Sequence, residues 1–408
     1  MNDMSKMNSK FYLIYVIMAL CILFKIFDFL YNKVDYNSSS NLKNIQSFIA
    51  KQISFHNYDE NMKLASAEFY NGNYKQAIVY YTYAIKQKQD SSEAYYKRAQ
   101  SKLENNDIIG AIEDFKITTE LNPNNIDALY NHASLIIPNY SSFNYPYIEF
   151  QVENFEYVNS CITNESNIAI KELDKVIHVQ PKNSNAYIYR GIAKSRLKKF
   201  DEASTDFNYA IELSPNNPFA YFAKGNMYSD LVEYKEYLIK QHKIKIIDDN
   251  YLKKALVNKQ KELPNNYNDN RDLSKIYRDE YLIILSNYNK AISLDPKFEE
   301  AYFNRGTLYW NLNNYTKAIK DFKKVLSLNP NDNDACINII YVKIDLAKFY
   351  RDKDKLIYKK LSNEIINDYN SLTRKYAKDM SMTKNLKELK KEIDEEIYKQ
   401  GVAELFNK

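Results

Sequence analysis

One six-residue phrase recurs four times along this chain of 408 residues. It reads AYYKRA at 94–99, AYIYRG at 186–191, AYFAKG at 220–225 and AYFNRG at 301–306. The second and third copies lie 34 residues apart, and insertions of 24 and 47 residues account for the longer intervals. Periods of about 20–50 residues are typical of solenoids, in which each repeat buries its apolar face against its neighbours.

Each 34-residue repeat carries the pattern of two antiparallel helices. The repeats begin at Tyr58, Ser92, Ile126, Ser184, Pro218 and Glu299, and a partial seventh begins at Asn333. Positions 4, 7, 8 and 11 of a repeat share one face of a first helix, and positions 20, 24 and 27 share one face of a second. Small residues at positions 8 and 20 allow close approach, large ones at 24 fill the space beside them, and proline at 32 ends the second helix. The predicted fold class is therefore all-α.

This pattern resembles the tetratricopeptide repeat family over roughly residues 58–345. The resemblance implies a right-handed superhelical solenoid of helix-turn-helix repeats. The repeats divide residues 58–332 into six units (58–91, 92–125, 126–183, 184–217, 218–298 and 299–332). A partial seventh repeat with C-terminal capping helices follows at 333–408. Before the repeats we expect a hydrophobic signal anchor (1–33) and a stalk (34–57).

The two insertions, near 138–166 and 237–278, interrupt the turn between the helices of repeats three and five. The first is aromatic and acidic, and its proline, serine and asparagine residues favour a loop. The second contains a basic segment, 243–263, that is expected to be helical. Insertions of this kind often lie on a binding face, and the alternative is a solvated excursion.

Position 7 and position 23 vary together between repeats. Arginine at position 7 (Arg98, Arg190, Arg305) accompanies aspartate at position 23 (Asp114, Asp206, Asp321). Repeat one has Leu64 and Tyr80 at these two positions instead. We interpret the arginines and aspartates as ion pairs across each hairpin, and the alternative is a ligand-binding role for the arginines. His132 occupies position 7 of repeat three, where we expect a packed core histidine rather than a ligand or base.

In the family that the chain resembles, the first helices line a concave groove through positions 2, 5, 6, 9 and 12. Carried onto this sequence, these positions give candidate peptide-binding residues: Tyr96, Tyr130, Asn131, Tyr189, Phe222, Asn226, Phe303, Asn304, Trp310 and Asn338. Aromatic rings supply contact area, and asparagine can form two complementary hydrogen bonds with a peptide backbone. The alternative is that the position-5 aromatics pack between repeats or beneath the C-terminal helices.

Charge at the start of the first helices bears on the partner. Position 2 is mostly acidic (Asp59, Glu93, Asp127, Glu300, Asp334). These side chains would repel an acidic C-terminal tail, so we expect the bound segment to be neutral or basic. The net charge of only +5 and this acidic row disfavour RNA, because nucleic-acid binding needs a basic surface to attract phosphates.

The sequence offers little for catalysis. The six glycines lie in repeat positions, in or near turns, or near the end, and none forms a phosphate-binding loop. The four histidines and three cysteines are scattered without the spacing of metal ligands. We therefore expect no enzymatic activity, metal or cofactor, and a protein-binding scaffold or assembly factor. The alternative is a structural protein that self-associates through its C-terminal helices or insertions, although a monomer is favoured.

The apolar run FYLIYVIMALCILF at residues 11–24 follows Lys6 and Lys10. It extends to Tyr31 only by including Lys25 and Asp28, and no small residues beyond it suggest a cleavage site. Residues 11–31 are therefore interpreted as an uncleaved signal anchor, with a cleaved signal peptide as the alternative. The basic flank predicts a cytoplasmic N-terminus and repeats on the opposite, extracytoplasmic side.

Overall fold

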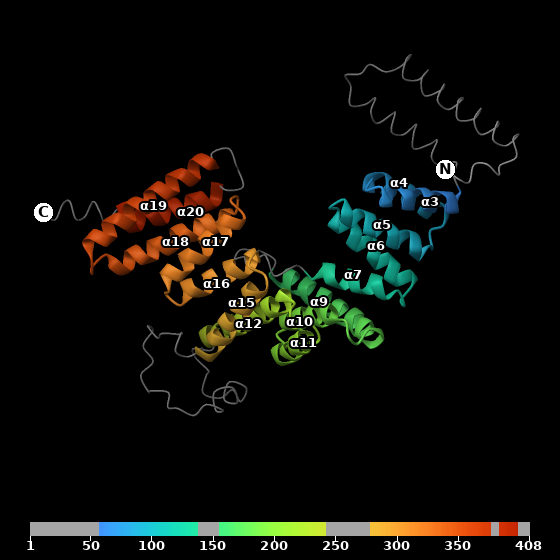
Figure 1. Ribbon diagram of the computed structural model, residues 1–408, viewed down its shortest axis with the longest axis horizontal. Coiled ribbons are helices and arrows are strands. Elements are labelled where there is room, and N and C mark those ends of the chain that lie inside the picture. The colour runs from blue at the N-terminus through green and yellow to red at the C-terminus, as the bar shows by residue number, and fades with distance from the viewer. Residues whose placement is uncertain (1–56, 138–154, 242–277, 377–382, 399–408) are drawn as a thin grey trace, which may run out of the picture. The chain divides into compact units, whose positions relative to one another are not determined.

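A computed structural model describes residues 57–137, 155–241, 278–376 and 383–398 (Figure 1). The chain divides into two compact units, residues 1–123 and 124–408, here called the N-terminal and C-terminal units. In the described ranges every regular element is a helix. The predicted fold class, an all-α solenoid of helix hairpins, is confirmed within each unit.

The N-terminal unit contains two hairpins among its described residues. They are formed by α3 (Tyr58–Tyr70) with α4 (Tyr74–Gln87), and by α5 (Ser92–Glu104) with α6 (Ile108–Leu121). Helix α3 begins at a capping box, in which Asn57 Oδ1 accepts from the Glu60 amide and Glu60 Oε2 accepts from the Asn57 amide. Ala65, Ala77 and Tyr81 are buried between α3 and α4, as the small and large positions of the repeat require.

The C-terminal unit continues the hairpin pattern. Its elements are α7 (Ile126–Ile136), α9 (Phe155–Val179), α10 (Ser184–Arg196), α11 (Phe200–Leu213), α12 (Pro218–Gln241), α15 (Arg278–Leu294), α16 (Glu299–Asn311), α17 (Tyr315–Leu328), α18 (Asn333–Tyr350), α19 (Lys355–Lys375), α20 (Thr383–Ile393) and the π-helical η3 (Asp394–Tyr398). The seven first helices (α3, α5, α7, α10, α12, α16 and α18) begin at the seven residues that start the repeats in the sequence.

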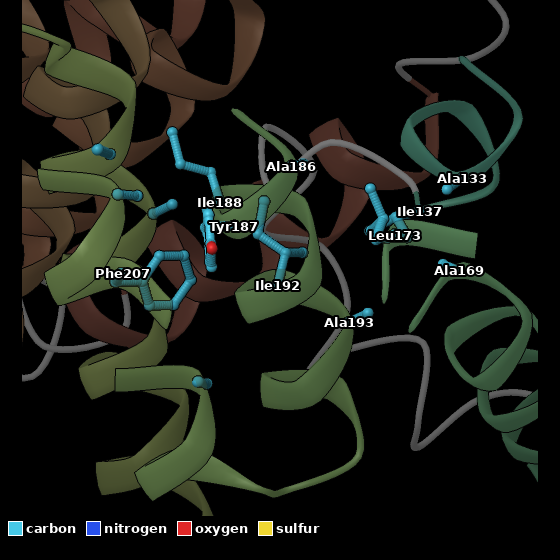
Figure 2. Close-up of a cluster of buried hydrophobic side chains, with 14 of the residues drawn as sticks. Ala133, Ile137, Ala169, Leu173, Ala186, Tyr187, Ile188, Ile192, Ala193 and Phe207 are labelled. Atoms are coloured by element: carbon cyan, nitrogen blue, oxygen red, sulfur yellow. The ribbon is translucent and has the colours of Figure 1, made fainter. Parts of the chain in front are cut away.

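The core of the C-terminal unit is shared between successive hairpins. Figure 2 shows side chains of α7, α9, α10 and α11 meeting in one cluster, with Leu173, Ile188, Ile192 and Phe207 among them. Leu173, Ile188 and Phe207 have no exposed surface. Each hairpin buries its apolar face against the next hairpin, so the core runs continuously from repeat to repeat.

The turn between the two helices of a repeat has a fixed backbone geometry. Gly72, Asn106, Lys198 and Asn313 all occupy position 15, and all have positive φ angles between 57° and 78°. Glycine and asparagine adopt this left-handed conformation more readily than other residues. Lys198 adopts it without the low steric cost of glycine or the preference of asparagine. The expected interruption of repeat three falls at this turn. In repeat five, however, α12 continues past position 15 to Gln241, so residues 237–241 of the expected insertion are helical.

The insertion boundaries differ in part from those expected. Helix α9 begins at Phe155, so residues 155–166 are helical rather than part of a loop. The proline residues that favoured a loop end at Pro146, and residues 155–179 contain neither proline nor glycine, which allows the helix to start early. Residues 138–154 and 242–277 lie outside the described ranges, as does the expected anchor at 11–31.

The end of the chain forms a further packed layer. A cluster of buried residues joins α18, α19 and α20, with Ile340, Ile365, Leu389 and Ile393 at its centre. Lys348 of α18 bonds Glu392 of α20 at 2.8 Å. These contacts pack α20 against the hairpin of α18 and α19.

Candidate protein-binding surface

Each arginine at position 7 forms a two-point ion pair with the aspartate at position 23. The Nε and Nη2 atoms of Arg98 lie 2.7 Å from the two carboxylate oxygens of Asp114. Arg190 binds Asp206 in the same way at 2.9 and 2.6 Å, and Arg305 binds Asp321 at 2.7 Å through both atoms. The aspartates are buried. These arginines are therefore used within the repeats, and a separate ligand-binding role has no support in this geometry.

The same arginines make a second contact that the sequence analysis missed. Their Nη1 atoms donate to position 25 of the preceding repeat: to Thr82 Oγ1 from Arg98, to Asp174 Oδ1 from Arg190 and to Asn289 Oδ1 from Arg305. Each guanidinium also lies 5.3–5.4 Å from the ring of a tyrosine at position 4 (Tyr95, Tyr187, Tyr302). The sequence does carry a signal for this contact: a polar residue stands 16 positions before each arginine, as the aspartate stands 16 positions after it.

Repeat three replaces this pair with a histidine and a glutamate. His132 Nδ1 lies 2.9 Å from both carboxylate oxygens of Glu172, and both side chains are buried. Glu172 occupies position 23. His132 thus takes the place that the arginines occupy in the other repeats and is packed in the core, in agreement with the sequence analysis.

Two candidate residues, Tyr130 and Tyr189, lie with Phe219 in a row of aromatic rings on the first helices of repeats three to five. The Tyr130 ring lies 5.9 Å from Tyr189, and Tyr189 lies 6.2 Å from Phe219. All three are half-buried, and we call them the aromatic row. Burial raises the pKa of Tyr130 to about 12. Phe219, at position 2 of repeat five, was not among the expected binding residues.

Three of the expected groove residues are instead buried between repeats five and six. Phe222 is 2% exposed, Asn226 0% and Asn304 6%. Asn226 Oδ1 accepts hydrogen bonds from the Tyr288 hydroxyl at 2.7 Å and from Asn304 Nδ2 at 3.0 Å. Their burial leaves these three residues with little open surface in this structure, and their role in peptide binding stays a prediction.

The remaining candidates are half-buried, and the aromatic ones have partners within their own unit. Tyr96 lies 5.7 Å from Phe115, and Phe303 lies 5.4 Å from Phe322. Trp310 Nε1 donates to Asp345 at 2.8 Å, and its ring stacks on Tyr341 at 6.2 Å. The position-5 aromatics Tyr96 and Phe303 therefore contribute to packing, while both side chains stay partly accessible. Asn131 and Asn338 are half-buried as well.

The acidic residues at position 2 are accessible. Asp59, Glu93, Asp127, Glu300 and Asp334 are all exposed at the starts of their helices. Their carboxylates interact favourably with the helix dipole, which is reason enough for their presence. They also give this edge of the first helices a negative charge.

In the ranges described by the structure, no three or more His, Cys, Asp or Glu side chains are grouped to hold a metal ion. Among the same residues, the search for a helix of sufficient length and apolar character to span a bilayer found none.

Comparison with known proteins identifies the repeats. A family model described as Tetratricopeptide repeat matches residues 62–133, and another with the same description matches 299–332. The chain is 39% identical over 85 residues to a UDP-N-acetylglucosamine–peptide N-acetylglucosaminyltransferase of Giardia intestinalis, covering 21% of this chain and 6% of that protein. It is 23% identical over 172 residues to Tetratricopeptide repeat protein 6 of Homo sapiens, covering 42% of this chain and 30% of that one.

Among solved structures, a tetratricopeptide repeat protein from Parabacteroides merdae is 15% identical with a TM-score of 0.44, and the match covers 79% of this chain and 97% of that one. The chain spans less than a third of the length of the two curated relatives named above. The family matches and the hairpin geometry agree on the same residues. The chain therefore contains tetratricopeptide repeats, at 62–133 and 299–332.

Proposed function

We propose that this protein is a non-enzymatic scaffold or assembly factor that binds an extended, neutral or basic segment of a partner protein along its first helices. The aromatic row carries the proposal. Tyr130, Tyr189 and Phe219 keep part of their rings accessible in three successive repeats. Rings presented in series suit an extended chain, because each can contact a successive side chain of the partner.

Charge supports the choice of partner. Asp127, Glu300 and Asp334 are exposed at the starts of α7, α16 and α18 in the same unit as the aromatic row. A basic segment would be attracted along this edge, whereas an acidic tail would be repelled. Because rim charges act mainly on the association rate, salt should weaken binding by slowing association.

Peptide binding tests the proposal directly. Fluorescent extended peptides with basic, neutral and acidic sequences would be titrated with the whole protein. We expect the basic or neutral peptides to bind, and the double variant Tyr189→Ser/Phe219→Ser to bind them at least about tenfold more weakly, since two partly accessible rings are lost. Tyr209→Ser removes an exposed ring from the second helix α11 and serves as the control. Preferred binding of acidic peptides, dependent on their free carboxylate, would exclude this partner class.

We further propose that residues 11–31 tether the protein to a membrane with the repeats on the extracytoplasmic side. The support is the apolar run at 11–24 with its basic flank. Carbonate extraction of membranes tests the tether, and protease protection tests the side. Release of the intact protein into the soluble fraction by carbonate would refute the tether.

A further inference from the structure

The exposed side of the second helices changes charge along the C-terminal unit. The exposed residues of α11 include no lysine or arginine, and their acidic members are Asp201, Glu202 and Glu212. The exposed residues of α17 and α19 include no aspartate or glutamate. Their exposed lysines include Lys317, Lys320, Lys323, Lys359 and Lys360. We call the α11 carboxylates the acidic face and these lysines the basic face.

The acidic face keeps most of its negative charge. Asp201 and Glu212 form no ion pair among the described residues, and Glu202 Oε2 lies 3.6 Å from Lys194 Nζ. Lys224 also borders this face, but its Nζ atom donates to a neutral amide of α11 at 2.7 Å. Two of the three carboxylates are therefore open to an external cation.

The basic face keeps its positive charge because the carboxylates of its own helices are bound by first-helix cations. Asp321 of α17 is buried and pairs with Arg305 at 2.7 Å. Glu364 and Asp368 of α19 are half-buried, and both bind Lys343 of α18, at 2.9 and 2.8 Å. In the ranges that the structure describes, no lysine of the basic face forms an ion pair of its own.

The lysines of α17 and α19 belong to one surface. The pKa of Glu364 is lowered, first by its hydrogen bond with Lys343 and further by the charges of Lys360 of α19 and Lys323 of α17. One carboxylate thus lies within electrostatic reach of a basic-face lysine from each helix. The positive charge is therefore concentrated in one place rather than spread over two separate sites.

Each charged face also exposes one large apolar side chain. Tyr209 of α11 is 42% exposed, and its ring lies 4.7 Å from the ring of Tyr187. Leu356, in the first turn of α19, is 80% exposed and precedes Lys359 and Lys360 by about one helical turn. Protein interfaces commonly have an apolar centre within a polar rim, and both faces provide these two parts.

We infer that the acidic face of one copy of this protein docks on the basic face of a second copy. The chain itself carries both members of a complementary pair of charged surfaces, and this favours a second copy as the partner. Because two different faces meet, the contact is head-to-tail, and further copies can add as a ring or an open chain. Charge complementarity sets the orientation and speeds association more than it adds affinity, so the association should be weak and sensitive to salt. The inference does not depend on the function proposed above.

Capture between two differently tagged copies tests the inference. Both copies are full length, and they are mixed in a non-ionic detergent before one tag is captured and the other is quantified. We expect wild-type copies to capture each other at low salt. At about 1 M salt, where the screening length is about 3 Å, capture should fall at least about tenfold.

Charge reversal makes the test specific to the two faces. Asp201→Lys/Glu212→Lys removes the negative charge of the acidic face, and Lys320→Glu/Lys359→Glu removes most of the positive charge of the basic face. Each double variant should capture its own kind at least about tenfold less than the wild type does, since its faces no longer complement each other. A mixture of the two variants should recover capture, because one supplies an intact basic face and the other an intact acidic face.

A matched control reverses two exposed lysines elsewhere in the same unit. Lys171→Glu/Lys175→Glu on α9 makes the same change in net charge as the basic-face variant and should retain self-capture. No self-capture of the wild type at low salt, or undiminished self-capture of both face variants, would overturn the inference. Loss in both variants without recovery in their mixture would also overturn it, since the two faces would then not be in contact. Recovery in the mixture shows in addition that both variants are folded.

Discussion

At the scale of single residues, the arginine at position 7 explains how successive repeats are joined. Arg305 binds Asp321 of its own repeat and Asn289 of the repeat before it, and it lies over Tyr302. The planar guanidinium has five N–H donors, so it can bond the aspartate and the asparagine while stacking on the tyrosine ring. A lysine ammonium group cannot make all three contacts in this geometry. Its loss would leave the buried carboxylate of Asp321 without a counter-charge.

We therefore expect Arg305→Ala to lower the free energy of unfolding by about 3 kcal/mol, because breaking one side of a buried pair strands the other charge. The double variant Arg305→Ala/Asp321→Ala should lose less than that single variant, since no charge is stranded. Urea denaturation measures both. The exposed residue Lys320, changed to alanine, is the control and should shift stability by no more than about 0.5 kcal/mol. A similarly small effect of Arg305→Ala would show that the pair does not stabilise the fold.

The burial of Tyr130 predicts a dependence on high pH. Its pKa is raised to about 12 in the folded protein, whereas the pKa of a tyrosine in the unfolded chain is about 10. The folded state therefore holds the proton more tightly. The stabilising contribution is complete below about pH 10 and is lost as the pH rises toward 12.

Comparison with Tyr130→Phe isolates this contribution, since the phenylalanine ring cannot ionise and other tyrosines are unchanged. The free energies of unfolding of the two proteins would be measured between neutral pH and pH 12. The wild type should lose stability relative to the variant above about pH 10. A constant difference across this range would contradict the assigned shift.

At the scale of helices, close approach of α12 and α15 depends on Gly225. A Cβ atom at this position would lie 2.7 Å from Cε1 of Tyr288, whose ring is buried. We expect Gly225→Ala to destabilise the protein by about 1–3 kcal/mol, because the ring cannot move without disturbing the core. A Cβ atom at Gly306 would lie 3.1 Å from Cε1 of Phe322, a distance that a small shift of the ring can relieve. Gly306→Ala should therefore destabilise the protein less than Gly225→Ala, also because alanine has a higher helix propensity than glycine. Chemical denaturation measures the free energy of unfolding of both variants. If Gly225→Ala lost no more stability than Gly306→Ala, the close contact between Gly225 and Tyr288 would be contradicted.

Much of this helical arrangement is predictable from the sequence, and the exceptions have physical causes. The small residues at positions 8 and 20 and the proline at 32 predict where hairpins form, because they control helix approach and helix ends directly. Burial of Asn226 and Asn304 could not be predicted, since it depends on Tyr288, which follows a long insertion. The aromatic row was anticipated at Tyr130 and Tyr189 but not at Phe219, because position 2 elsewhere carries mostly acidic residues.

At the scale of the whole molecule, stability should be local. Solenoid repeats contact only their neighbours, so a core defect weakens the adjacent repeats most. Phe322 of α17 is fully buried and contacts the ring of Phe303. Phe322→Ala should cost about 3–5 kcal/mol, the range for removing a large aromatic side chain from a core.

Hydrogen exchange followed by mass spectrometry resolves where that energy is lost. In Phe322→Ala we expect faster exchange in peptides from 299–345, the repeat that holds the defect and the helix after it. Peptides from 57–123 should exchange as in the wild type, because those residues form a separate compact unit with their own buried positions. Lys320→Ala, on the exposed side of the same helix, should alter neither region. Acceleration of equal size in both regions would mean that the chain unfolds as one cooperative body, and the local account of its stability would then fail.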